Sequence, residues 1–457
     1  MCKKQHYIAA FFFIVMLAQI CTVQAQEYYD LTLDQAIRIA AEKNRDIINA
    51  KEDVKKAGFQ ITEAASAAYP SLNGFWDMDK VIEPMVFVIQ FPDPDTGKLV
   101  KNRLKVGTDH TMNLGAALTQ PLYVGGKVGT ALKAAKIYRS ISESSLETVT
   151  HGVVAGVVVS FNSVILTKEM LTINRESLAQ AERNLENVQS KYEAGAATKY
   201  DFVRAKVQVA NMKPALLNAE NRLTVAYLNL KETLGISPDS QLSITGSLSE
   251  PDSSIFRIAS LETAVQNRPD LRASRSSVDL YDKSVKIAKG NFLPTLTAGT
   301  TFMYMGNFDT FTYAADDWNR NWTASVNLSF PIFSGFKNSS QYKQAKTDYY
   351  KAKTNYNKAY DVVIIEVQEG VLNLRNAIKT IESQRMNVEE AEMALEMAES
   401  MYESGKATQL EVFDMQLTLE RAKTNMINAI FEAGIAEITL KQSLGLIDTV
   451  DEKGNKS

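Results

Sequence analysis

Polar and apolar residues alternate strictly over one stretch of the chain, from Asn321 to Phe330. A period of two residues places successive side chains on opposite faces of a strand, so this stretch predicts a β-strand with one apolar and one polar face. A second stretch of the same kind begins after Pro294. We expect the apolar face to carry Leu296, Ala324, Val326 and Leu328, and the polar face to carry Thr323, Ser325 and Asn327.

Two regions of the chain show this strand pattern, about 70–124 and about 294–333. Each is long enough for a pair of strands. In the first region we expect one strand from Pro70 to about Gln90 and a turn over Pro92–Gly97, because Pro, Asp and Gly favour turns. These strands are longer than the roughly five or six residues that are usual in globular proteins.

A helical pattern follows each strand region. Apolar and small residues recur at alternate steps of three and four over 171–192 and again over 381–402. This spacing predicts coiled-coil helices. A helix over about 127–192 would be roughly 100 Å long at the usual rise per residue. Gly195 and Gly405 follow the two patterns, and we expect the chain to reverse there, giving two long helical hairpins.

The chain contains the same unit twice. Residues 181–236 align with residues 391–446 without a gap at an offset of 210, and 18 of the 56 positions are identical. Self-similarity at a fixed offset indicates a structural repeat. We therefore expect repeat 1 at 26–236 with a helical hairpin over about 127–234, a linker or equatorial segment at 237–259, repeat 2 at 260–446 with a hairpin over about 337–444, and a tail at 447–457.

Residues 1–25 have the features of an export signal. Two lysines precede an apolar core, and Ala25 ends a run of small residues suited to cleavage. Cys21 leaves lipidation open as an alternative. Cys2 and Cys21 are the only cysteines, so a chain cleaved after Ala25 would contain no disulfide and no cysteine–metal site.

Composition excludes several classes of protein. The 50 basic and 53 acidic residues give a net charge of −3, which provides no basic surface for nucleic acid. Beyond the signal, the histidines are His110 and His151, and neither belongs to a nucleophile–base pair or a metal-ligand motif. We therefore predict that the protein is not an enzyme and has no cofactor and no metal site.

The strands, rather than the helices, are the candidates for crossing a membrane. Residues 148–167 are uncharged, but their counterparts at 358–377 carry five charges, so we expect neither to lie in lipid. Long alternating strands are typical of outer-membrane barrels. Four strands cannot close a barrel, which needs about eight, so the chain would have to oligomerise. Aromatic residues suited to a membrane interface lie near the strand ends: Trp76, Tyr304, Tyr313, Trp318 and Trp322.

These features, in this order, resemble the TolC-type outer-membrane efflux proteins, the outer-membrane factor family. The motif Tyr-x-x-Gly-x-x-Thr occurs at both hairpin tips, starting at Tyr192 and Tyr402, and Gln120–Tyr123 and Phe330–Phe333 each lead into a glycine. The resemblance implies a mainly α-helical homotrimer with a membrane β-barrel of about twelve strands closed by trimerisation. It also implies a periplasmic tunnel and, as partners, outer-membrane lipid, a periplasmic adaptor and an inner-membrane pump. The expected function is a passive duct for efflux or secretion.

The same resemblance implies a gate at the periplasmic end. Counted from the tip glycines, Asp201 and Tyr402 match the gate positions. The family's gate arginine is replaced here by Ala407, and we expect neighbouring Lys406 to serve instead. Tyr402 also continues the coiled-coil pattern, so a purely packing role remains an alternative.

Further roles follow from the resemblance near the tips. Glu411 and Asp414 match an acidic ring at the entrance, with a solvated helix face as the alternative. The tip turns, which would also contact the adaptor, are expected to use Tyr192, Gly195, Thr198, Gly405 and Thr408. The sequence leaves the cargo and the class of pump open. A second function, a periplasmic coiled-coil adaptor or scaffold without a pore, also stays open at this stage.

Overall fold

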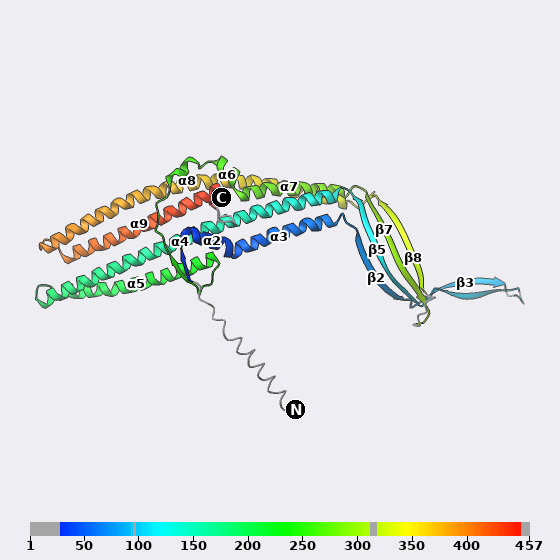
Figure 1. Ribbon diagram of the computed structural model, residues 1–457, viewed down its shortest axis with the longest axis horizontal. Coiled ribbons are helices and arrows are strands. Elements are labelled where there is room, and N and C mark those ends of the chain that lie inside the picture. Colours follow the sequence, from blue (N-terminus) through cyan, green and yellow to red (C-terminus); the bar gives the residue numbers. More distant parts are fainter. Residues whose placement is uncertain (1–27, 93, 95–96, 311–317, 449–457) are drawn as a thin grey trace, which may run out of the picture. The chain divides into compact units, whose positions relative to one another are not determined.

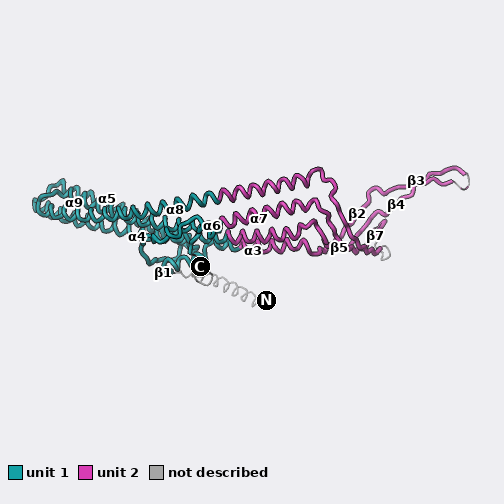
Figure 2. The backbone as a smooth tube through the Cα atoms, turned by 90° about the horizontal axis from the view of Figure 1, so that it is seen from above, with its two compact units in different colours: residues 1–51, 145–270, 360–457 teal, residues 52–144, 271–359 magenta. Residues whose placement is uncertain are grey.

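The computed structural model describes residues 28–92, 94, 97–310 and 318–448. The predicted export signal, Tyr313 and most of the predicted tail lie outside the described residues. The chain divides into two compact units, shown in Figure 2. Unit 1 comprises Met1–Lys51, Ser145–Asp270 and Tyr360–Ser457, and unit 2 comprises Glu52–Ser144 and Leu271–Ala359.

Four long helices dominate the secondary structure. Helices α4 (Lys127–Glu193) and α8 (Lys337–Glu403) have 67 residues each, and α5 (Lys199–Leu234) and α9 (Gln409–Leu444) have 36 each. The helix predicted over about 127–192 is therefore present as α4. Within unit 1 the helices follow the order α8, α9, α4, α5 (Figure 1), and contacts described below join each neighbouring pair. At the tips the packing is closer than a simple row, because Lys191 of α4 also contacts Tyr402 of α8.

Short elements pack against this row. Strand β1 (Tyr28–Leu31) pairs in parallel with β6 (Gln241–Ile244), which lies in the predicted linker together with a 3₁₀ turn at Ser253–Arg257. Helices α2 (Leu33–Lys43) and α6 (Leu261–Asn267) complete unit 1. Residues of α2, α4, α5 and both short strands form its main core. The largest fully buried members are Val157, Val164, Leu230 and Leu234.

Two glycines fix how the short helices meet the long ones. Gly235 ends α5 in the left-handed conformation (φ 72°), and a Cβ there would lie 2.3 Å from the carbonyl oxygen of Lys43. Gly445 ends α9 in the same way (φ 71°), and a Cβ there would lie 2.7 Å from the carbonyl carbon of Asn267. Beside the first contact, Asn44 donates from Nδ2 to the Thr233 carbonyl at 2.8 Å. Only glycine permits both the backbone conformation and this close approach.

The uncharged run of α4 contributes several residues to the core of unit 1. α4 is long and apolar enough to cross a membrane by composition, and 44% of its most apolar window is buried within the protein. Val154, Val157 and Phe161 from this run pack in the core of unit 1. Burial against α2 and α5 accounts for the lack of charge, in keeping with the expectation that this segment does not lie in lipid.

Unit 2 contains an antiparallel sheet of four strands in the order β2-β5-β7-β8. The strands are β2 (Ser71–Lys80), β5 (His110–Val124), β7 (Thr295–Phe308) and β8 (Trp318–Ser329). Most of α3 (Arg45–Ser66) and α7 (Pro269–Gly290) and the first turns of α4 and α8 also belong to this unit.

One strand prediction was wrong. The strand expected from Pro70 to about Gln90 is two strands, β2 and β3 (Met85–Pro92), and β3 pairs with β4 (Leu99–Val106) in a separate hairpin. The segment predicted as a turn, 92–97, therefore lies between β3 and β4 and not between two strands of the main sheet; residues 93, 95 and 96 of it lie outside the described residues. The interruption covers residues 81–84 and ends with Pro84, which lacks the N–H that a continuous ladder needs. Apolar residues resume after Pro84, which hides the break in the sequence pattern.

The register of β7 and β8 shows which residues share each face of the main sheet. Leu296 pairs with Leu328 and Ala298 with Val326, so these apolar residues share one face. Thr301 pairs with Thr323 on the other face, which is polar. The apolar face is uncovered in this chain: Trp322 is 78% exposed and Val326 is 72% exposed.

Candidate gate at the helical hairpin tips

Both hairpin tips use the same turn. Gly195 (φ 75°) and Gly405 (φ 73°) adopt the left-handed conformation just after α4 and α8. The amide of Gly195 donates to the carbonyl of Tyr192 at 3.0 Å, and the amide of Gly405 donates to that of Tyr402 at 3.0 Å. The glycine of the motif is therefore a helix C-terminal turn, which L-residues adopt only with strain.

The threonine of the motif begins the return helix. Thr198 accepts the amide of Asp201 at 3.2 Å, and the Asp201 carboxylate accepts the Thr198 amide at 3.1 Å and its hydroxyl at 2.6 Å. Thr408 and Glu411 repeat this arrangement, with the carboxylate of Glu411 2.6 Å from the Thr408 amide. Each pair is a capping box that satisfies free helical amides.

The caps lower the pKa of both carboxylates. Hydrogen bonds from the Thr198 hydroxyl and amide hold the pKa of Asp201 below its usual value. The amide and hydroxyl of Thr408 do the same for the pKa of Glu411. The two acids stand at the same offset of 210 as the repeats, so they are counterparts in structure. From the sequence, Asp201 was expected at a gate and Glu411 in an entrance ring. In the local structure both side chains are helix caps.

The two hairpins meet through Lys191 and Tyr402. The Lys191 ammonium donates to the Tyr402 hydroxyl at 3.2 Å and lies 4.5 Å from the centre of the ring. This is both a hydrogen bond and a cation–π contact. In the part of the chain that is described, no hydrogen bond joins Tyr402 to Asp201. Sequence reasoning missed Lys191, although its position directly before the motif tyrosine of the first tip was a usable signal.

A second polar contact joins the hairpins further from the tip. Gln409 of α9 donates from Nε2 to Oδ1 of Asn184 in α4 at 3.2 Å. Beside it lies a cavity of about 250 Å³ lined by α5 and α9, with Asp201, Arg204 and Phe413 among its residues. The contact sets the start of α9 beside α4.

The remaining predicted residues lie near these contacts without joining them. Lys406, Asp414 and Thr408 are exposed, and Ala407 is half-buried. Among the described residues, the side chain of Lys406 forms no ion pair with the gate positions. Tyr192 stacks on Phe202 of its own hairpin, with ring centres 5.5 Å apart and planes 6° from parallel.

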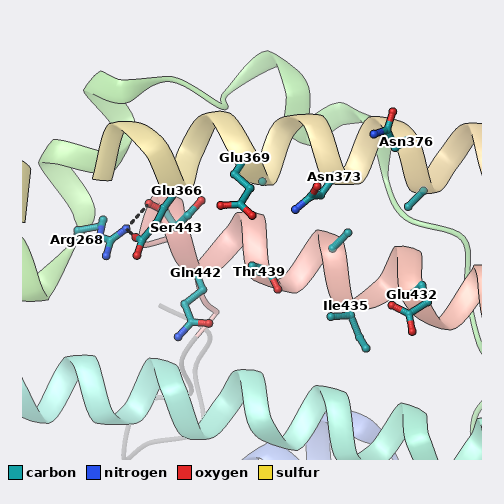
Figure 3. Close-up of a pocket in the computed structure, with 13 residues that line it drawn as sticks. Arg268, Glu366, Glu369, Asn373, Asn376, Glu432, Ile435, Thr439, Gln442 and Ser443 are labelled. Atoms are coloured by element: carbon teal, nitrogen blue, oxygen red, sulfur yellow. Dashed lines mark hydrogen bonds and ion pairs between the residues drawn. The ribbon is translucent and has the colours of Figure 1, made fainter. Parts of the chain in front are cut away.

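Another cavity of unit 1 lies away from the tips, between α8 and α9, with a volume of about 590 Å³ (Figure 3). Arg268 closes one end, where its guanidinium binds Glu366, Asp270 and the carbonyl of Ser443. Burial alone would lower the pKa of Arg268, but its bonds to Asp270 and Glu366 outweigh burial and raise it. The arrangement ties α6 and α7 to both long helices of the second hairpin.

Comparison with known proteins identifies the family. The model of the family described as outer membrane efflux protein matches residues 36–236 and again residues 260–446. This chain belongs to the outer membrane efflux protein family.

No group of three or more histidine, cysteine, aspartate or glutamate side chains suited to a metal ion occurs over the residues that the structure describes.

Relatives in the outer membrane efflux protein family have low sequence identity to this chain but align with most of its length. The chain is 25% identical to outer membrane protein TolC of Vibrio cholerae over 343 residues, covering 74% of this chain and 78% of that protein. It is 21% identical to outer membrane efflux protein BepC of Brucella suis, covering 93% of this chain and 87% of that protein. Among solved structures, the CmeC outer membrane channel of Campylobacter jejuni shares the fold, with a TM-score of 0.74 at 16% identity, covering 90% of this chain and 85% of that one.

Proposed function

We propose that this outer membrane efflux protein is a passive trimeric duct, coupled through a periplasmic adaptor to an inner-membrane pump and gated at the hairpin tips. The observation that carries the proposal is the uncovered apolar face of the four-stranded sheet. An exposed apolar surface of this extent needs lipid or protein to cover it. Its partner face is polar, as the lumen of a barrel requires.

The edges of the sheet support trimerisation. Strands β2 and β8 each pair on one side only, and four strands are too few to close a barrel. Three copies supply enough strands for closure and leave no free edge. The equal lengths of α4 and α8, and of α5 and α9, support a pseudo-symmetric helical tunnel built from two similar hairpins per copy.

The gate would rest on the contact of Lys191 with Tyr402. This contact joins the tip of hairpin 1 (α4 and α5) to the tip of hairpin 2 (α8 and α9). In a trimer, three copies of these tips would narrow the tunnel. Glu411 and Asp414 lie three residues apart on α9, so they share one side of the helix and would be repeated around the axis. A ring of carboxylates makes a pore cation-selective. The exposed tip turns would be the surface offered to the adaptor.

The pore-free scaffold, the second function considered, has no support from family membership. A scaffold also has no use for a sheet with an exposed apolar face. The deciding experiment extracts the protein from the outer membrane in detergent and records it in planar lipid bilayers. We expect a trimer whose gel mobility changes on heating and which forms discrete channels. A detergent-independent monomer without conductance would overturn the proposal.

A further inference from the structure

The hairpin of β3 and β4 is an addition to one repeat only. It lies in the connection between β2 and β5, residues 81–109, whereas the connection between β7 and β8 spans only 309–317. The shorter connection has no room for two strands of eight residues, so the second repeat contributes its strands to the main sheet without such a hairpin. The β3–β4 hairpin projects from the end of the main sheet that lies away from α3 and α7 (Figure 1).

The register of the β3–β4 hairpin gives it two chemically different faces. Phe87 pairs with Leu104 on one face, and Arg103 pairs with Val88 on the other, because side chains alternate along each strand. The apolar face comprises Met85, Phe87, Ile89, Phe91, Val100, Leu104 and Val106, with Asn102 as its one polar member. The basic face comprises Lys101, Arg103 and Lys105 together with Val86, Val88, Gln90, Pro92 and Leu99. Neither strand contains an acidic residue.

The apolar face has no cover within the part of the chain that is described. Phe87 is 53% exposed, Phe91 is 55% exposed and Leu104 is 53% exposed. A hairpin of two strands is only marginally stable in water unless one of its faces packs against something else. The apolar face of the β3–β4 hairpin therefore needs a partner from outside the chain.

The cations of the basic face differ in their surroundings. The Lys105 ammonium lies 2.5 Å from a carboxylate oxygen of Asp109 and 3.6 Å from one of Asp309. These contacts fasten the base of the β3–β4 hairpin to the rim of the main sheet. Lys101 and Arg103 are exposed and, among the residues that the structure describes, form no ion pair. Two cations of the basic face are thus available to an anionic ligand.

Aromatic residues indicate how far the base of the β3–β4 hairpin lies from the lipid. The register places Trp76, Phe302, Tyr304 and Trp322 on the uncovered apolar side of the main sheet. In membrane barrels such aromatic girdles mark the interfaces with water. Trp76 lies four residues before Lys80, where β2 ends. Four residues rise roughly 10 Å along the membrane normal at the usual strand tilt, so the base of the hairpin lies at about the level of the headgroups.

Two further cations occur at this level on the same side of the main sheet. Arg320 pairs with Tyr304, and Lys80 is the last residue of β2. Both side chains are exposed. A cation on the lipid-facing side of a barrel is costly at the bilayer midplane, but close to anionic headgroups it is favourable. The outer rim of the sheet and the basic face therefore carry charge of the same sign, complementary to phosphate.

We propose that the β3–β4 hairpin lies on the outer surface of the outer membrane and binds the phosphate-bearing lipid headgroups of the outer leaflet. The apolar face enters the boundary between headgroups and acyl chains, and Lys101 and Arg103 bind phosphates. This rests on the proposed barrel, whose apolar side meets lipid, and it assigns a ligand to the hairpin. An amphipathic element with Phe and Leu on one face and Lys and Arg on the other suits a membrane interface. A protein on the apolar face would leave the basic face without counter-charges.

Fluorescence quenching tests where the apolar face lies. Phe91→Cys is labelled with an environment-sensitive NBD probe, and the trimer is placed in phosphatidylcholine nanodiscs that contain diphosphorylated lipid A. Gln90→Cys, one residue away on the basic face, is the matched control. We expect lipids with a nitroxide just below the headgroup to quench the probe at 91 several-fold more than the probe at 90. Leu104→Cys repeats the measurement at a second position of the apolar face, in case Phe91→Cys disturbs assembly.

Removal of charge tests the role of the phosphates. Adding Lys101→Gln/Arg103→Gln to Phe91→Cys should lower the ratio of bound to unbound hairpin about fivefold for each cation removed, the usual contribution of one basic side chain at an anionic surface. Nanodiscs of phosphatidylcholine alone should lower the same ratio with both cations in place. Lys343→Gln/Lys353→Gln makes an equal charge change at exposed positions of α8 and serves as the control.

The outcomes separate this inference from the proposed function. A conducting trimer in which the probes at 91 and 104 are quenched no more than the probe at 90 would overturn the inference alone. A disulfide between the Phe91→Cys side chains of two copies would assign the apolar face to a second copy and overturn it as well. Quenching that is the same without phosphates and without the two cations would contradict headgroup binding. Absence of any trimer or conductance would overturn the proposed function.

Discussion

Lys191 and Tyr402 connect the two helical hairpins of this outer membrane efflux protein at their tips, with the ammonium 3.2 Å from the hydroxyl oxygen and 4.5 Å from the ring centre. Tyr402 was expected at the gate together with Asp201 and Lys406, whereas Lys191 was not. The contact has two components, and substitutions can remove them separately.

Tyr402→Phe should loosen the closed tip by about 0.5–1.5 kcal/mol, because it removes the hydrogen bond and keeps the ring. Lys191→Ala should add the loss of the cation–π contact, roughly 0.5–1 kcal/mol more. The measurement is the open probability of single channels in planar bilayers, with vancomycin sensitivity of cells as a second readout. If both variants had the same open probability as the parent protein, Tyr402 would be a packing residue without a gate role.

The capping boxes predict an acid sensitivity of the tips. Asp201 and Glu411 have a lowered pKa in the folded protein. Their contribution to the stability of the folded tips is therefore fully present above the unfolded pKa and is lost as pH falls through the folded pKa. Amide hydrogen exchange at the starts of α5 and α9, corrected for the intrinsic pH effect, should therefore speed up in acid. Thr198→Ala should cost about 1 kcal/mol of helix stability and abolish this dependence in α5 only. A pH dependence that survives this change would assign it to another group.

The left-handed glycines predict unequal effects of the same substitution. Gly195→Ala places a side chain in open space and should cost roughly 1–2 kcal/mol from backbone strain alone. Gly235→Ala carries the same strain and also drives a methyl group into the backbone at Lys43. Thermal unfolding of the detergent-solubilised protein should show a clearly larger loss for Gly235→Ala. Equal losses of thermal stability would mean that the backbone at the junction of α2 with α5 shifts to accommodate the methyl group.

The two faces of β8 predict opposite responses to charge. Val326→Arg puts a cation on the apolar face and should cost roughly 2–4 kcal/mol if that face meets the bilayer midplane. Ser325→Arg puts it on the polar face and should mainly change conductance. Trimer yield in the outer membrane and single-channel current separate the two. Similar assembly defects at both positions would refute the assignment of faces.

The acidic ring can be tested without breaking the cap. Gln replaces Glu in capping boxes, so Glu411→Gln keeps the turn and removes the charge. Combined with Asp414→Asn, it should abolish most of the block by trivalent metal complexes added from the periplasmic side, with trimer assembly unchanged. A block that persists in the double variant would place the ring elsewhere, and Asp201 would be the next residue to substitute.

The sequence alone determined much of the architecture, because its signals are local or periodic. The steps of three and four over 171–192 placed the end of α4 to within a residue or two, and the strand alternation separated Leu296 and Val326 from Thr323 before any register was known. The motif of each tip is likewise local, since a left-handed glycine and a threonine cap act within a few residues of each other.

Only the tertiary structure decided which tip residues meet. The hydrogen bonds of Asp201 to Thr198, which make this carboxylate a helix cap, are seen only in the structure. Lys191 reaches Tyr402 across a chain separation of 211 residues, a pairing that depends on how the tip of α8 packs beside α4. The break at Pro84 was lost for a related reason: an apolar run continues the pattern of a strand, whereas the ladder of backbone hydrogen bonds decides where the strand ends.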